Sequence, residues 1–123
     1  TSFPLVDALE DTLVLLVVCV DLKEVSSFDK DLDRVGVISG GSVYPFTRNI
    51  LLAARNEKLG GVLTTYLAHR EEEVRDLLNV PADHAVAAMI SIGEPVKQLR
   101  KLKRNPVASF TVIDSFAGPA FEG

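Results

Sequence analysis

The sequence predicts a mixed α/β (α+β) protein with the element order strand, helix, strand, helix, strand. Apolar runs too short for typical helices, at residues 12–20 and 84–95, indicate strands, and helical spacing of apolar residues recurs between them. The 123 residues, of which 47% are hydrophobic and 24% charged, are typical of one ordered globular domain. We therefore expect a single domain over residues 1–123, whose residues 96–123 form an extended basic and hydrophobic C-terminal segment.

The first expected element is a strand in residues 12–20, TLVLLVVCV. This continuous apolar run is rich in valine and is bounded by Asp11 and Asp21, which indicates a strand covered on both faces. Its Cys19 is the only cysteine, so an internal disulfide is excluded, and the residue is expected to be a small buried hydrophobe. Residues 21–38 mix charges with irregularly spaced apolar residues and predict a mobile connection.

A helix is expected in residues 42–60 after a glycine-rich break. Ser42 is the expected N-cap, Pro45 fits the first turn, and Gly60 stands where glycine closes a helix. The apolar residues of this helix cover more than one face: Val43, Tyr44, Phe46, Ile50, Leu51, Leu52, Ala53 and Ala54. A helix with so broad an apolar surface is buried on more than one side, and in a short chain the second side indicates another subunit.

The remaining elements follow in order. Residues 60–67 predict a short β-branched strand, and residues 69–81 predict a helix whose first turn carries three glutamates favoured by the helix macrodipole. Residues 84–95 predict a largely apolar strand that stops at a Gly-x-Pro sequence. Residues 96–123 are expected to be extended.

Several classes of function find little support in the sequence. The net charge of −4 argues against nucleic-acid binding, and the longest apolar run is too short to cross a bilayer. No basic signal peptide opens the chain, so a cytoplasmic protein is expected. His69 and His84 lack the spacing of a metal pair, and no metal site is expected. A Ser-His-Asp arrangement stays open on composition, but no G-x-S-x-G turn is present. With no evident nucleophile, an enzyme of this sequence needs a cofactor to supply the reactive atoms.

One stretch, KQLRKLKRNP at residues 97–106, concentrates positive charge. Its five cationic residues are Lys97, Arg100, Lys101, Lys103 and Arg104. One interpretation is a solvated stretch beside a strand. The other is an anion site, because the stretch follows the end of a strand, where ligands gather in α/β folds, and arginine with lysine makes a good phosphate clamp.

Four stretches, in the same order and spacing, resemble the C-terminal half of the FMN-dependent nitroreductase family. They are RNILLAAR at 48–55 within the long helix, LNVP at 78–81, GEP at 93–95 and RNP at 104–106. The family is built on a central, mainly antiparallel sheet flanked by helices, and its members form intertwined homodimers with two FMN sites at the subunit interface. The resemblance therefore implies the same fold, cofactor and assembly for this chain.

The resemblance also implies site residues. The strand after the long helix passes the reactive edge of the flavin, which assigns Leu63, Thr64, Thr65 and Tyr66 to cofactor binding, and the C-terminal basic pair, Lys103 and Arg104, to the FMN phosphate. No side chain is assigned a catalytic role. Many relatives have Glu-Gly near Thr65–Tyr66, and this chain departs from that pattern, so the resemblance does not define its hydrogen bonding to flavin N5.

The N-terminal flavin-binding segment of the family, with sequences like RRSiR, has no counterpart in TSFPLVDALED, so an incomplete domain with weakened FMN affinity is expected. Two functions follow. The first is a flavoprotein oxidoreductase that passes electrons from NAD(P)H through FMN to a nitroaromatic, quinone or similar acceptor. The alternative is a non-catalytic homodimeric binding module that keeps the scaffold without the cofactor.

Overall fold

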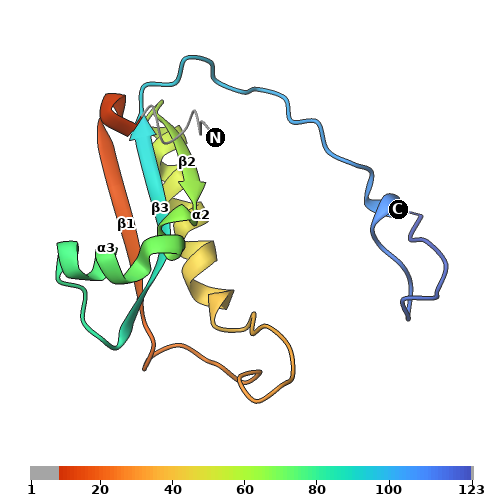
Figure 1. The fold of residues 1–123 in the computed structure, drawn as a ribbon. Coiled ribbons are helices and arrows are strands. Elements are labelled where there is room, and N and C mark those ends of the chain that lie inside the picture. The colour runs from red at the N-terminus through yellow and green to blue at the C-terminus, as the bar shows by residue number, and fades with distance from the viewer. Residues whose placement is uncertain (1–8, 123) are drawn as a thin grey trace.

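The computed structural model describes residues 9–122, and its main elements follow the predicted order (Figure 1). They are β1 (Val14–Asp21), α2 (Gly40–Asn56), β2 (Gly60–Thr64), α3 (Glu71–Leu78) and β3 (His84–Gly93), with short 3-10 helices η1 (Leu9–Asp11), η2 (Tyr66–Arg70) and η3 (Val107–Ser109). The predicted mixed α/β class, with an antiparallel sheet flanked by helices, is confirmed. Across residues 9–122, no helix combines the length and the apolar character needed to cross a membrane.

The three strands form one antiparallel sheet in the order β1-β3-β2. β3 lies in the centre, and its Ile90 is completely buried between Leu16 of β1 and Leu63 of β2. The sequence of β3 has no charged side chain after His84, as expected for a strand with neighbours on both edges. β2 and β1 are the edge strands of this sheet.

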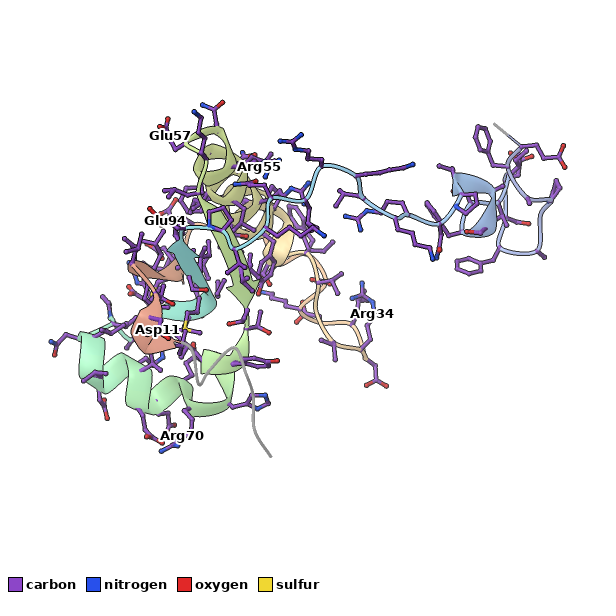
Figure 2. All side chains as sticks on the ribbon, turned by 90° about the horizontal axis from the view of Figure 1, so that it is seen from above. Asp11, Arg34, Arg55, Glu57, Arg70 and Glu94 are labelled. Atoms are coloured by element: carbon purple, nitrogen blue, oxygen red, sulfur yellow. The ribbon has the colours of Figure 1, made fainter. Side chains whose placement is uncertain are left out.

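The two α-helices lie on opposite faces of the sheet (Figures 1 and 2). α2 packs along β2 and β3 through an apolar stripe that includes Val43, Ile50 and Leu51. Thr47 lies within the same buried surface, and its hydroxyl donates a hydrogen bond to the carbonyl of Tyr44 over 2.7 Å, so the polar atom has a partner. On the other face, Glu71 ties α3 to the sheet by accepting the backbone N–H of Val86 over 2.7 Å.

The start of α2 differs from the prediction. The helix begins at Gly40, with Ser39 at the N-cap, so Ser42 lies in the first turn and does not cap the helix. Pro45 falls in the second turn, where its missing N–H leaves the carbonyl of Gly41 without its helical donor. Gly41 is exposed, so water can satisfy that carbonyl.

The end of α2 also differs. The left-handed residue after the helix is Lys58, with φ 63°, whereas Gly60 is the first residue of β2. The Leu59 N–H donates to the Ala54 carbonyl over 2.9 Å, and the Lys58 N–H donates to the Arg55 carbonyl over 3.0 Å. These two bonds form a Schellman ending, so the geometry expected of a glycine is adopted by a lysine.

β1 is less covered than its sequence indicates. Val14 and Leu15 are each 47% exposed, and Cys19 is exposed, so the prediction of a buried cysteine is wrong for the single chain. The reason is that β1 lies at one edge of the sheet, whereas α2 packs mainly on β3 and on β2 at the opposite edge. A continuous apolar run therefore marks the strand correctly but does not establish that both faces are covered.

The connection between β1 and α2 consists of turns organised around one buried carboxylate. Asp29 is 5% exposed and accepts hydrogen bonds from the Val37 N–H over 2.8 Å, the Ile38 N–H over 3.4 Å and the Arg34 guanidinium over 2.8 Å. The hydrogen bond from Val37, and then the one from Arg34, lower the pKa of Asp29 below its ordinary value of 3.8. This loop is held to the start of α2 by Asp29.

Replacement of Asp29 by alanine should release this loop. The Val37 and Ile38 amides lose their acceptor, so we expect faster hydrogen exchange at both amides. Because the folded-state pKa is below the unfolded one, the stabilisation by Asp29 is present above pH 3.8 and is lost as the pH falls through the folded pKa. The variant should therefore show a weaker acid destabilisation than the parent chain. Unchanged amide hydrogen exchange, together with an unchanged loss of stability at low pH, would contradict this account of the loop.

After β3 the chain leaves the sheet as an extended arm, which we define as residues 96–122 (Figure 1). The arm ends in a small hook, in which Val112 pairs with Ala120. Large apolar side chains on the arm lie open to solvent, among them Phe110 at 70% and Phe116 at 103% exposure. Among residues 9–122, nothing covers these apolar side chains of the arm.

Candidate functional site

The residues assigned to the flavin edge lie at the end of β2, an edge strand. Leu63 packs against the core, Thr64 ends the strand, and Thr65 precedes η2, in which Tyr66 is 44% exposed. Only one edge of β2 is paired, with β3, within the described part of the chain. The other edge therefore presents backbone donors and acceptors that a planar ligand can use.

The hydroxyl of Thr64 is the most informative atom of this edge. Its Oγ1 is buried, and it has no hydrogen-bond partner among residues 9–122. A buried hydroxyl without a partner costs free energy, so such an atom indicates a site where another group completes the bond. The sequence motif named Thr64, but only the structure shows that its hydroxyl is unsatisfied.

Lys103 and Arg104 lie on the arm, and both are exposed. Neither forms an ion pair within residues 9–122. The arm carries them away from the sheet, so one chain does not bring them to Thr64 (Figure 1). The start of the arm is held against the end of α2 by hydrogen bonds from Arg55 to the Leu99 carbonyl over 3.1 Å and from Gln98 to the Lys58 carbonyl over 3.3 Å.

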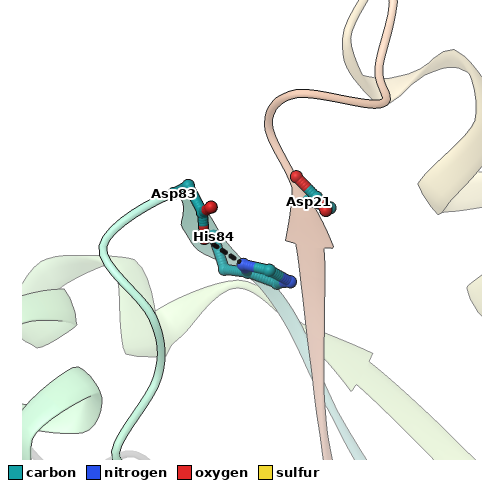
Figure 3. Close-up of side chains that lie close together, drawn as sticks. All are labelled: Asp21, Asp83 and His84. Carbon is teal, nitrogen blue, oxygen red and sulfur yellow. Dashed lines mark hydrogen bonds and ion pairs between the residues drawn. The ribbon is translucent and has the colours of Figure 1, made fainter.

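A third group of polar side chains, absent from the sequence-based prediction, gathers where β1 ends and β3 begins (Figure 3). Asp21 and His84 are paired across the two strands, and the carboxylate of Asp83 lies 2.7 Å from His84 Nδ1. The spacing of the histidines in the sequence gives no sign of this group, because the antiparallel register brings together residues more than sixty positions apart. That register was the missing signal.

A cation of the chain already pairs with this group. Lys23 Nζ lies 2.7 Å from Asp83 Oδ2, and the Lys23 N–H donates to Asp21 Oδ1 over 2.9 Å. The hydrogen bond from Lys23, followed by the one from His84, lowers the pKa of Asp83. These contacts tie the residues at the end of β1 to those at the start of β3, and we describe the group as a polar junction of β1 and β3.

Comparison with known proteins decides the family. The sequence pattern described as "Nitroreductase family" matches residues 5–94, which is most of the chain and includes β1, α2, β2, α3 and β3. The chain belongs to the nitroreductase family. The match contains Thr64 and Tyr66 and ends before the basic stretch, so the assignment of Lys103 and Arg104 stays a prediction from the resemblance. No curated protein matches the sequence.

Solved structures of nitroreductases share the fold. A nitroreductase family protein from Clostridium difficile superposes with a TM-score of 0.67 at 16% identity, covering 87% of this chain and 62% of that chain. NfrA2 of B. megaterium superposes with a TM-score of 0.65 at 20% identity, covering 85% of this chain and 46% of that chain. Nitroreductase A from Vibrio parahaemolyticus superposes with a TM-score of 0.64 at 23% identity, covering 86% of this chain and 47% of that chain. The chain thus spans less than two thirds of each of these relatives.

Proposed function

We propose that this nitroreductase-family chain is an FMN-dependent oxidoreductase that uses NAD(P)H to reduce a nitroaromatic, quinone or similar acceptor. The observation that carries the proposal is the unsatisfied, buried hydroxyl of Thr64 at the strand end where the family resemblance puts the flavin edge. Family membership supports the same chemistry. The proposal includes a cytoplasmic location, which a chain with a single cysteine suits.

FMN, when bound, supplies the hydride and electron transfer that no side chain of the site provides. The protein's part is to hold and orient it. Thr64, Thr65 and Tyr66 would contact the ring from the free edge of β2, and Leu63 fixes that edge by packing into the core. Lys103 and Arg104 would neutralise the phosphate by charge-assisted hydrogen bonds.

The partner in this proposal is a second copy of the chain. The arm carries Lys103 and Arg104 away from β2 of its own chain, so the two halves of one flavin site would come from different copies. Exposed apolar side chains on the arm and on α2, including Phe46 at 57%, offer the surface for such a homodimer. In this arrangement residues 1–123 act as one nitroreductase-like domain, with the arm crossing to its partner.

The activity test uses the purified chain with added FMN. Under exclusion of oxygen, NADPH or NADH should bleach the flavin absorbance, and a quinone or nitroaromatic should restore it. Flavin that binds but is bleached by neither nicotinamide would contradict the oxidoreductase proposal, because the family reaction begins with that reduction.

Replacement of Thr64 by valine separates a ligand contact from a structural role. Without FMN, the change removes a buried hydroxyl that has no partner, so the melting temperature should stay the same or rise. With FMN, one hydrogen bond is lost, so the dissociation constant should rise about fivefold. Calorimetric titration and thermal melting provide the two readouts. Unchanged FMN affinity would exclude Thr64 from the site.

A non-catalytic homodimeric binding module is the second candidate. It is favoured by the Thr65–Tyr66 sequence, where many relatives carry Glu-Gly at the flavin edge. This candidate predicts a dimer whose melting temperature does not respond to FMN. An FMN-dependent rise in melting temperature that Arg104→Ala abolishes would exclude it.

A further inference from the structure

A groove between α2 and the start of the arm is lined by positively charged side chains that form no ion pair within residues 9–122. The groove has a volume of about 460 Å³. Four of its lining residues are cationic, Arg48, Arg55, Lys97 and Arg100, and no acidic side chain lines it. Its walls are otherwise mainly apolar, formed by Leu51, Leu52, Leu59, Pro95, Leu99 and Leu102.

Hydrogen bonds hold the two walls of the groove together. Arg55 Nη2 donates to the Leu99 carbonyl over 3.1 Å, and Gln98 Nε2 lies 3.3 Å from the Lys58 carbonyl and 3.4 Å from the Leu59 carbonyl. Figure 2 shows Arg55 beside the first part of the arm. The groove is therefore formed by a fixed segment, in contrast to the outer arm.

The four cations of the groove are not neutralised by the protein. None of them forms an ion pair with any residue in the range 9–122. Glu57 and Glu94, the acidic residues closest to the groove in sequence, are labelled in Figure 2, and neither lines it. Four like charges around one hollow produce a positive potential that favours an anion.

The groove is separate from the proposed flavin edge. It adjoins Gly60 and Gly61 at the start of β2, whereas Thr64 ends that strand. The three residue steps from Gly61 to Thr64 span about 10 Å along a strand. The phosphate-binding pair of the proposed flavin site, Lys103 and Arg104, does not line the groove.

From the charge, the apolar walls and the fixed geometry, we infer that this groove binds a small organic oxyanion, a phosphate or carboxylate attached to an apolar body. The guanidinium groups of Arg48 and Arg55 hold the oxyanion in forked geometry, and Lys97 and Arg100 add charge from the arm. The leucine side chains cover the apolar body. Such a ligand also joins the arm to α2, since both walls contact it.

Phenyl phosphate is the probe that tests this inference, by calorimetric titration of the full chain without FMN. We expect saturable binding that weakens as salt is added. Inorganic phosphate should bind about tenfold more weakly, because it leaves about 60 Å² of apolar surface unburied at the site. Benzyl alcohol, which lacks the anion, should show no saturable binding.

Three variants locate the binding. Arg48→Gln should weaken phenyl phosphate binding about tenfold, and it should fold normally because Arg48 is exposed and makes no hydrogen bond to the described residues. Lys30→Gln makes the same change of net charge on the β1–α2 loop and should have no effect. The double variant Lys103→Gln, Arg104→Gln should lose FMN binding and keep phenyl phosphate binding, so failure of the groove and failure of the proposed flavin site are distinguishable.

The inference is overturned by any of three results. They are the absence of saturable phenyl phosphate binding, equal affinity for inorganic phosphate, and equal weakening by Arg48→Gln and Lys30→Gln. It is also overturned if Arg48→Gln abolishes FMN binding together with phenyl phosphate binding, because the groove would then belong to the flavin site.

Discussion

Replacement of Arg104 by alanine should weaken FMN binding by about tenfold to a hundredfold, the effect of losing charge-assisted hydrogen bonds to a phosphate. Arg104 is exposed on the arm and has no ion-pair partner within residues 9–122, so the substitution leaves no buried charge behind. The melting temperature without FMN should therefore stay unchanged. Quenching of FMN fluorescence during titration measures the affinity.

A matched control removes a positive charge elsewhere. Lys30 lies on the β1–α2 loop and is exposed, as Arg104 is, so Lys30→Ala should leave FMN binding unchanged. Equal affinities of Arg104→Ala and the parent chain would remove Arg104 from the site. If both variants weaken FMN binding equally, the effect of Arg104 is one of net charge and not of a contact with the phosphate.

Replacement of Ile90 by alanine should have the largest effect on stability, a loss of about 2–5 kcal/mol in the free energy of unfolding. Ile90 is completely buried in the central strand and pairs with Leu16 on one side and Leu63 on the other. Truncation leaves a cavity that neighbours on both edge strands line. Urea unfolding at a single protein concentration measures the change, because dimer formation makes stability depend on concentration.

Leu77 provides the contrasting substitution. It is 79% exposed on α3, so Leu77→Ala should change the free energy of unfolding by no more than about 0.5 kcal/mol. A loss at Ile90 as small as that at Leu77 would contradict the position of β3 at the centre of the sheet.

Local patterns in the sequence were sufficient to predict the order of strands and helices, because each pattern depends only on residues that are close together in the chain. The apolar run from residue 84 predicted a strand, and the apolar residues of 42–60 predicted a helix, but neither pattern showed that β3 is central or that Leu51 packs on the core while Phe46 is exposed. Details that depend on distant residues were not predictable. Cys19 is exposed because β1 is an edge strand and α2 packs mainly on β2 and β3. The ending of α2 is a local exception, because Lys58 takes the left-handed position within a Schellman ending where a glycine was expected.

The candidate site shows the same division. The resemblance singled out Thr64 and Arg104 from short motifs, but the unsatisfied hydroxyl of Thr64 became visible only with its surroundings in place. The groove could not be foreseen, because Arg48 and Lys97 are nearly fifty residues apart and only the antiparallel pairing of β2 with β3 brings their segments together. The buried position of Asp29 was likewise not predictable, because it depends on the hydrogen bonds that Val37 and Arg34 donate in the folded loop.

The central claim is that the end of β2 in one copy and the basic pair of the arm in another hold one flavin. Nuclear magnetic resonance titration of the labelled chain with FMN, at a concentration where sedimentation gives the mass of two chains, tests it most directly. We expect the amide signals of Thr64, Tyr66 and Arg104 to shift along one saturation curve, with one FMN per chain. Shifts confined to residues of the groove, or shifts of Thr64 and Arg104 with different dissociation constants, would contradict it.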